Sequence, residues 1–232
     1  MKIAAALLVV VCAGAAANAS VILSQWNFNS TVGDANTATG VNTPSVGAGT
    51  ALTVGGVTSA FASGQAGTGS TDPELLDDSG FQTTTFPVQG AGNKTAGVQF
   101  NVSTVGFSNV IVSWDQRHSN TASRFAQFQY STDGTTFNDF GAAFAGITGD
   151  TWFNNRSIDL SSVAGVNNNA SFAFRIVAAF AASTTAYTAS SPTGTYAGGT
   201  WRFDMVTVTV PTPGALTLAG LGTLVATRRR RA

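Results

Sequence analysis

The chain has 232 residues, of which 11 are Lys or Arg and 11 are Asp or Glu, so its formal net charge is zero. Five of the basic residues, Lys2 and the arginines at 228–231, lie near the two ends, which leaves 6 basic against 11 acidic residues, a net charge near −5, in between. Phosphate contacts need clustered Lys and Arg. The composition therefore excludes a nucleic-acid partner.

Residues 1–19 have the pattern of a secretory signal peptide. Lys2 precedes an apolar run, and small residues follow over 13–19. Ala17 and Ala19 fit the A-x-A cleavage pattern, so we expect the exported protein to begin at Ser20. The alternative is a membrane-spanning helix, but the apolar run is shorter than the roughly 20 residues that a bilayer requires. The only cysteine, Cys12, would be removed, so packing, supplemented at most by bound ions, has to stabilise the exported chain.

Residues 20–210 have the alternation of one all-β domain. β-Branched and aromatic residues recur with period 2 between clusters of Gly, Asn, Ser and Thr. We expect short strands and long loops over 33–69, and strands over residues 21–28, 97–102, 109–116, 124–130, 151–160, 171–180 and 200–210. About eight or more strands without helical crossovers predict an antiparallel, jelly-roll-like β-sandwich. Helices are expected only in the signal segment and in a short hydrophobic segment near the C-terminal end.

The alternation also predicts which residues face the core. Arg175 points away from a face that is made by Phe172, Phe174, Ile176, Ala178 and Phe180. Gln127 and Gln129 likewise lie opposite Ala126, Phe128 and Tyr130. Asp133 and Gly134 follow directly, and an Asp-Gly pair between alternating runs predicts a β-hairpin.

The segment 211–232 has a different composition. Pro211 and Pro213 lack a backbone donor and end the preceding strand. Fourteen uncharged residues, 214–227, follow; as a helix they would cover about 21 Å, less than the ~30 Å hydrocarbon core. The chain then carries a positive end that resists translocation, made by Arg228, Arg229, Arg230 and Arg231. We expect a stop-transfer tail that holds the body outside and presents the stretch from Val210 to Gly214 near the outer membrane face.

This order of a Pro-x-Pro motif, a short apolar span and terminal arginines resembles the PEP-CTERM tail that exosortases recognise. Thr212 stands where the common form has Glu. Residues 113–134, 156–176 and 199–210 are similar to the β-sandwich bodies of exported bacterial proteins with such tails. The resemblance implies an exosortase-type membrane protease or transpeptidase as partner, a transient inner-membrane anchor, and transfer to the cell surface or to an extracellular polysaccharide matrix. A related tail occurs on some ice-binding proteins, so the name 'ice-binding' would describe the tail alone and not the activity of the body.

The body is poor in groups that catalyse reactions. Glu74 is its only glutamate and His118 its only histidine. We expect His118 on a loop, where a polar surface role is favoured over a catalytic or metal-binding one, since neither a nucleophile-elbow motif nor a second histidine accompanies it. A pair of aspartates could still serve a glycosidase, although their spacing does not favour one. The sequence therefore predicts a protein without enzyme activity.

Four carboxylates lie within seven residues, and they could surround a hard cation such as Ca²⁺: Asp72, Glu74, Asp77 and Asp78. They lack the Asp-x-Asp-x-Asp-Gly pattern, so a solvated acidic turn is favoured. Asp204 shares strand parity with Val206, Val208 and Val210, which predicts a buried carboxylate that needs an arginine or a cation. We expect it to pair with Arg117, Arg175 or Arg202. A structural calcium ion, held by Asp204 and N-terminal backbone oxygens, is the alternative.

Exposed aromatic rings would suit a carbohydrate ligand. Core packing is favoured for Trp26, Trp114, Trp152 and Trp201, because all four fall within predicted strands. Phe125 is the better candidate for an exposed ring, and it joins His118 as a candidate ligand-binding residue. The favoured function is an exported, non-enzymatic protein with a structural or adhesive sandwich. A carbohydrate-binding module, with extracellular polysaccharide as its partner, is the next alternative, and a polysaccharide hydrolase the third.

Overall fold

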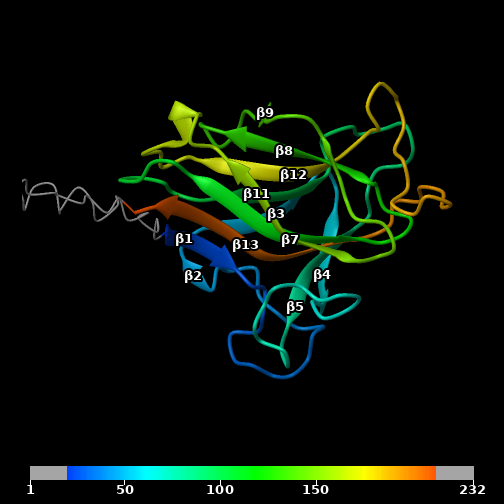
Figure 1. The fold of residues 1–232 in the computed structure, drawn as a ribbon, viewed down its shortest axis with the longest axis horizontal. Coiled ribbons are helices and arrows are strands. Elements are labelled where there is room, and N and C mark those ends of the chain that lie inside the picture. Colours follow the sequence, from blue (N-terminus) through cyan, green and yellow to red (C-terminus); the bar gives the residue numbers. More distant parts are fainter. Residues whose placement is uncertain (1–19, 213–232) are drawn as a thin grey trace, which may run out of the picture. The chain divides into compact units, whose positions relative to one another are not determined.

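The computed structural model describes residues 20–212 (Figure 1). These residues form two antiparallel sheets of seven and six strands, with one short 3₁₀ helix at Ala164–Val166 and no α-helix within the described range. The predicted jelly-roll-like β-sandwich is therefore confirmed. The two segments expected to be helical, in 1–19 and 211–232, lie almost wholly outside the described residues.

The first sheet has the strand order β11-β7-β13-β1-β2, with β5 beside β13 and β4 beside β5. Its strands are β1 (Ser20–Trp26), β2 (Val46–Gly47), β4 (Thr58–Ser63), β5 (Ser79–Thr84), β7 (Ile111–His118), β11 (Trp152–Asp159) and β13 (Trp201–Pro211). The long strand β13 lies in the middle, where it pairs with β7 along most of its length and with β5 near its beginning.

The second sheet has the order β10-β8-β12-β6-β3. The strand β10 pairs with the beginning of β8, and β9 pairs with β8 near its end. Its strands are β3 (Thr50–Val54), β6 (Gly97–Asn101), β8 (Phe125–Ser131), β9 (Asn138–Asp139), β10 (Phe144–Ala145) and β12 (Ala173–Ala179). The hairpin predicted at Asp133 is present, since β8 pairs with β9. Gly134 adopts a φ of +76°, and the Asp133 carboxylate accepts hydrogen bonds from the backbone amides of Thr135 and Thr136 at 2.8 and 2.6 Å.

Aromatic rings fill the space between the sheets. Trp26 of β1 meets Phe100 of β6 with ring centroids 5.0 Å apart, and Trp114 of β7 stacks on Phe128 of β8 at 5.8 Å. Phe174 of β12 stacks on both phenylalanines, at 5.0 and 5.6 Å. The face predicted for residues 171–180 is confirmed, because Phe172, Phe174, Ile176 and Ala178 all belong to this core. Trp26, Trp114 and Trp201 are buried in it as expected, and Trp152 is buried outside it.

Two long connections extend from one edge of the first sheet. Residues 27–45 follow β1 and residues 64–78 join β4 to β5, and Figure 1 shows both at the bottom of the view, in blue and cyan. They touch each other where the amide of Ser30 donates to the Asp77 carboxylate at 3.2 Å. Val21–Val210 form one compact unit that contains both connections.

Candidate functional site

An irregularity in β13 determines where Asp204 points. The register with β7 pairs Asp204 with Asp115 and resumes at Thr207 with Ser113, so β13 has a bulge between these pairs. Met205 within it has a φ of +46°, which is uncommon for a residue with a side chain. The extra residue reverses the alternation, since a slip of one residue exchanges the two faces.

Asp204 consequently lies on the outer face of the first sheet. The valines at 206, 208 and 210 face the core, whereas Asp204 lies beside Asp115 on the opposite face. Its burial, predicted from the sequence, is confirmed at 0% exposure. The prediction that it shares a face with the valines is wrong, because the alternation was counted through the bulge.

The connection 64–78 covers this outer face and brings two more carboxylates to Asp204. One oxygen atom each of Asp72, Asp78 and Asp204 lies within 4.8 Å of the others, and all three residues are buried. We call these residues the aspartate cluster. Asp72 and Asp78 belong to this connection and Asp204 to β13, so folding brings Asp204 to the other two.

Hydrogen bonds orient each carboxylate of the aspartate cluster. Asp72 accepts from the Asn29 side chain at 2.9 Å and from the Glu74 amide at 2.8 Å. The Oδ2 atom of Asp78 accepts from Gln65 and, at 3.4 Å, from Ser70. Asp204 Oδ1 accepts from the Met205 amide at 2.7 Å. Two buried oxygens, Oδ1 of Asp78 and Oδ2 of Asp204, have no hydrogen-bond partner in the described part of the chain.

The arginine expected to pair with Asp204 binds elsewhere. Arg202 donates to Gln82 and to the carbonyl of Ser63, Arg117 pairs with Asp150 at 2.8 Å, and Arg175 donates to Gln99. Between residues 20 and 212 the ion pairs are Arg117–Asp150 and Lys94–Asp139, and neither involves the aspartate cluster. The prediction of an arginine partner for Asp204 is therefore wrong.

The ionised state of the aspartate cluster is unfavourable, because its carboxylates are buried without a neighbouring cation among the described residues. Burial, and then the like charge of Asp78, raises the pKa of Asp204 well above its usual value. Burial also raises the pKa of Asp72 and of Asp78. Two carboxylate oxygens no more than 4.8 Å apart repel each other by at least about 3 kcal/mol at an effective dielectric constant of about 20. The cluster must therefore take up protons or bind a cation.

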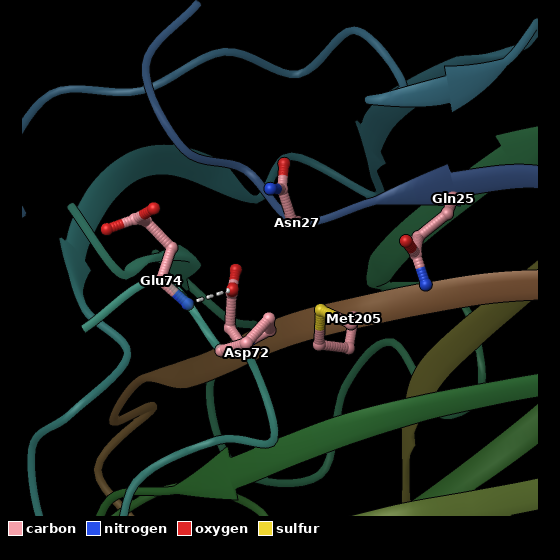
Figure 2. Close-up of a pocket in the computed structure, with 6 residues that line it drawn as sticks. Gln25, Asn27, Asp72, Glu74 and Met205 are labelled. Atoms are coloured by element: carbon pink, nitrogen blue, oxygen red, sulfur yellow. Dashed lines mark hydrogen bonds between the residues drawn. The ribbon is translucent and has the colours of Figure 1, made fainter. Parts of the chain in front are cut away.

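The other two acidic candidates lie apart from this cluster. The Asp77 carboxylate binds the Ser30 amide at 3.2 Å. Glu74 lines a pocket of about 320 Å³ together with Gln25, Asn27, Asp72, Pro73 and Met205. Figure 2 shows the Asp72 side chain between the Glu74 backbone and Met205, with the Glu74 carboxylate pointing away. Asp72 thus connects the aspartate cluster to a pocket that is open to solvent.

His118 is the last residue of β7 and is buried at 1% exposure, so the prediction of a loop position is wrong. Its Nδ1 lies 2.8 Å from the carbonyl of Ser123, which requires a proton on that nitrogen. Its ring packs on Trp201 with centroids 4.7 Å apart. Burial lowers the pKa of His118 to about 3, so the ring is neutral at pH 7.

Phe125, the other candidate ligand-binding residue, is half-buried at the beginning of β8. The Arg124 guanidinium lies 5.9 Å from the centre of its ring. Its side chain therefore presents only part of the ring to solvent.

The outer face of the second sheet carries a row of side chains that the sequence did not reveal. Cross-strand pairing aligns one residue from each of β3, β6, β12, β8 and β9, and these five form the outer row: Leu52, Gln99, Arg175, Gln129 and Asp139. Alternation along one strand predicts the face of each residue, but only the register between strands predicts the row.

Contacts along the outer row hold its polar groups in place. Arg175 Nε donates to Gln99 at 2.7 Å, and its guanidinium lies 3.5 Å from the ring centre of Phe137. Gln129 donates to Asp139 at 2.9 Å, and Lys94 forms an ion pair with the same carboxylate. Leu52 is 38% exposed, and the side chains of Lys94 and Asp139 are 35% and 38% exposed. The row and the adjoining Lys94 therefore offer an apolar surface, a cation and a carboxylate to solvent.

The sorting and cleavage residues lie at the limits of the described chain. β13 includes Val210, which is buried, and ends at Pro211, and Thr212 follows. Ser20 begins β1. Ala17, Ala19, Pro213, Gly214 and the arginines at 228–231 lie outside the described residues. Across 20–212, no helix has the length and apolar character needed to cross a membrane.

No protein-family model and no curated protein matches the chain. Among solved structures it is similar to the CBM22-1 xylan-binding domain of Xyn10C from Paenibacillus barcinonensis, with a TM-score of 0.51 and 15% identity over 86% of this chain and 100% of that one. It is also similar to the CBM22-1-CBM22-2 tandem domain of the same protein, with a TM-score of 0.50 and 16% identity over 87% of this chain and 49% of the tandem. At these identities the likeness establishes a shared β-sandwich fold.

Proposed function

We propose that this chain is a carbohydrate-binding β-sandwich module without catalytic activity, which acts at the cell surface or in the extracellular matrix. The observation that carries this proposal is the outer row, where charged, amide and apolar side chains cross five strands of one sheet. The similar fold of a xylan-binding domain supports it. Together they favour the binding module over the structural or adhesive role that the sequence alone favours.

The chemistry of the outer row suits a polysaccharide. Sugar hydroxyls both donate and accept hydrogen bonds. The row offers a donor at Arg175 and an acceptor at Asp139, and Lys94, which pairs with Asp139, offers a second donor beside the row. Gln99 and Gln129 are only 7% and 8% exposed, so they fix these groups. Five strands about 4.8 Å apart span about 19 Å, a length that accommodates several sugar rings.

Export and sorting form the second part of the proposal, and they rest on the sequence. Ala17 and Ala19 support cleavage before Ser20, and the motif at 211–213 with the arginines at 228–231 supports recognition by an exosortase. The inner membrane would hold the chain transiently. The intact mass of the exported protein tests this part: a product lacking 1–19 and the tail arginines is expected, and a mature form that still ends at Ala232 would contradict tail removal.

Affinity electrophoresis tests the binding function. The purified protein is run through gels that contain xylan, other soluble polysaccharides or none, and at least one polysaccharide should slow its migration. Phe137→Ala and Arg175→Ala should abolish the retardation, because they remove the pair that Arg175, at the centre of the outer row, forms with the Phe137 ring beside the row.

Phe107→Ala is the matched control, because Phe107 is an exposed phenylalanine outside the outer row. This variant should be retarded like the parent protein. Unchanged migration of the parent in every polysaccharide, or equal retardation of all variants, would contradict the proposed site. Circular dichroism of each variant establishes that it is folded.

A further inference from the structure

The aspartate cluster has no positively charged partner among the described residues. Asp72, Asp78 and Asp204 are buried, and their oxygens lie within 4.8 Å of one another. Neither ion pair found between residues 20 and 212 involves these three residues. Buried charges are normally paired or bound to a metal, so three adjacent unpaired carboxylates need a separate explanation.

An independent observation points to a ligand at this position. Asp204 belongs to the aspartate cluster and is completely buried, and its Oδ2 atom has no hydrogen-bond partner among the described residues. Oδ1 of Asp78 is also buried and has no hydrogen-bond partner among the described residues. The remaining carboxylate oxygens already accept hydrogen bonds from Asn29, Gln65 and Ser70, among others. The local structure thus orients the carboxylates and leaves two of their oxygens free.

We propose that Asp72, Asp78 and Asp204 bind one structural Ca²⁺ ion. Carboxylate oxygens are the ligands that hard cations prefer. Ca²⁺ forms bonds of about 2.4 Å, so opposite ligands lie about 4.8 Å apart, whereas Mg²⁺ draws its ligands to about 2.1 Å. The limit of 4.8 Å between the aspartate oxygens admits both ions, but three protein carboxylates favour Ca²⁺, because Mg²⁺ usually keeps several waters and binds through one or two carboxylates.

The pocket beside Asp72 provides access from solvent and room for further ligands. Ca²⁺ takes about six to eight oxygens, more than three aspartates supply with one oxygen each. Asp72 and Met205 lie in the wall of the pocket, next to the polar side chains of Gln25 and Asn27 (Figure 2). Water entering by this route would complete the coordination shell.

The ion would fasten the connection 64–78 to the first sheet. Asp72 and Asp78 belong to this connection, while Asp204 belongs to β13. Between the two loop ligands, Leu75 and Leu76 are exposed by 68% and 72%, so this stretch buries little apolar surface of its own. Removal of calcium should therefore release the connection and open it to proteolysis.

Calorimetry and thermal melts of the EDTA-treated protein test this proposal, which does not depend on sugar binding because the outer row lies on the other sheet. Titration with CaCl₂ should show one bound ion per chain, and calcium, more than magnesium, should raise the melting temperature. Asp204→Asn should lower calcium affinity by more than the roughly 10- to 100-fold typical of a lost outer-shell partner. Asp139→Asn, in an exposed ion pair, should bind calcium normally.

The melting temperature of Asp204→Asn separates a metal ligand from a merely structural residue. Without calcium the variant should melt higher than the parent, because it lacks one of the repelling buried charges; with calcium it should melt lower. Limited proteolysis should cut the parent near Leu75 in EDTA but not in calcium. Absence of calcium binding, equal stabilisation by magnesium, or unchanged calcium affinity of Asp204→Asn would overturn the proposal.

Discussion

Acid should destabilise this protein through His118. The native ring is buried and its pKa is lowered from 6.5 to about 3, whereas the unfolded chain takes up a proton below about pH 6.5. The unfolded state therefore binds more protons between these values, and stability falls as the pH falls from about 7 toward 3. At about pH 5, 1.5 units below the unfolded pKa, the loss from this residue amounts to about 2 kcal/mol.

Urea unfolding of the parent and of His118→Asn, at about pH 7 and about pH 5, measures this contribution. The Asn amide can still donate toward the Ser123 carbonyl that His118 binds, and it does not titrate. The difference in unfolding free energy between the two proteins should shift by about 2 kcal/mol in favour of the variant on going to pH 5. Carboxylate titrations are common to both proteins, so they cancel in this difference. A difference in unfolding free energy that does not change with pH would refute the buried, neutral ring.

Three substitutions test other parts of the structure. Phe174→Ala removes a ring that stacks on Phe100 and Phe128, so the free energy of unfolding should fall by about 3–5 kcal/mol; a loss below about 1 kcal/mol in urea titrations would contradict this packing. Gly134→Ala should cost about 1–2 kcal/mol, because its φ of +76° is unfavourable for alanine, and an unchanged thermal melt would argue against this turn. Gly64→Ala would push a methyl group into the Asp78 carboxylate, so calorimetry should show weaker calcium binding; normal affinity would place the ion elsewhere.

Local patterns in the sequence predicted much of the fold. Alternation identified the core face of β12, since Phe174 and its neighbours obey period 2 without interruption. The Asp133-Gly134 pair predicted its hairpin because turn geometry depends on adjacent residues alone. The lack of helical periodicity in residues 20–210 likewise agrees with the absence of α-helix from the described range.

Features that depend on distant pairing could not be predicted in the same way. The bulge at Met205 inverts the face of Asp204, and no residue type in β13 signals it. The sequence predicts His118 on a loop, but β7 extends to include it and the ring packs on Trp201. The outer row requires the register of five strands, and the aspartate cluster requires the path of the connection 64–78. Sequence proximity suggested Asp77 as a cluster member, whereas its carboxylate binds Ser30.

The most direct test of the proposed function is an NMR titration of ¹⁵N-labelled protein with a soluble oligosaccharide of the polysaccharide that retards it in affinity gels. Binding at the outer row should shift the backbone amide signals of the second sheet, above all those of Gln99, Arg175 and Gln129. It should leave the signals near Asp204 on the first sheet unchanged. Shifts confined to the first sheet, or no shifts at saturating sugar, would contradict a carbohydrate-binding module that works through the outer row.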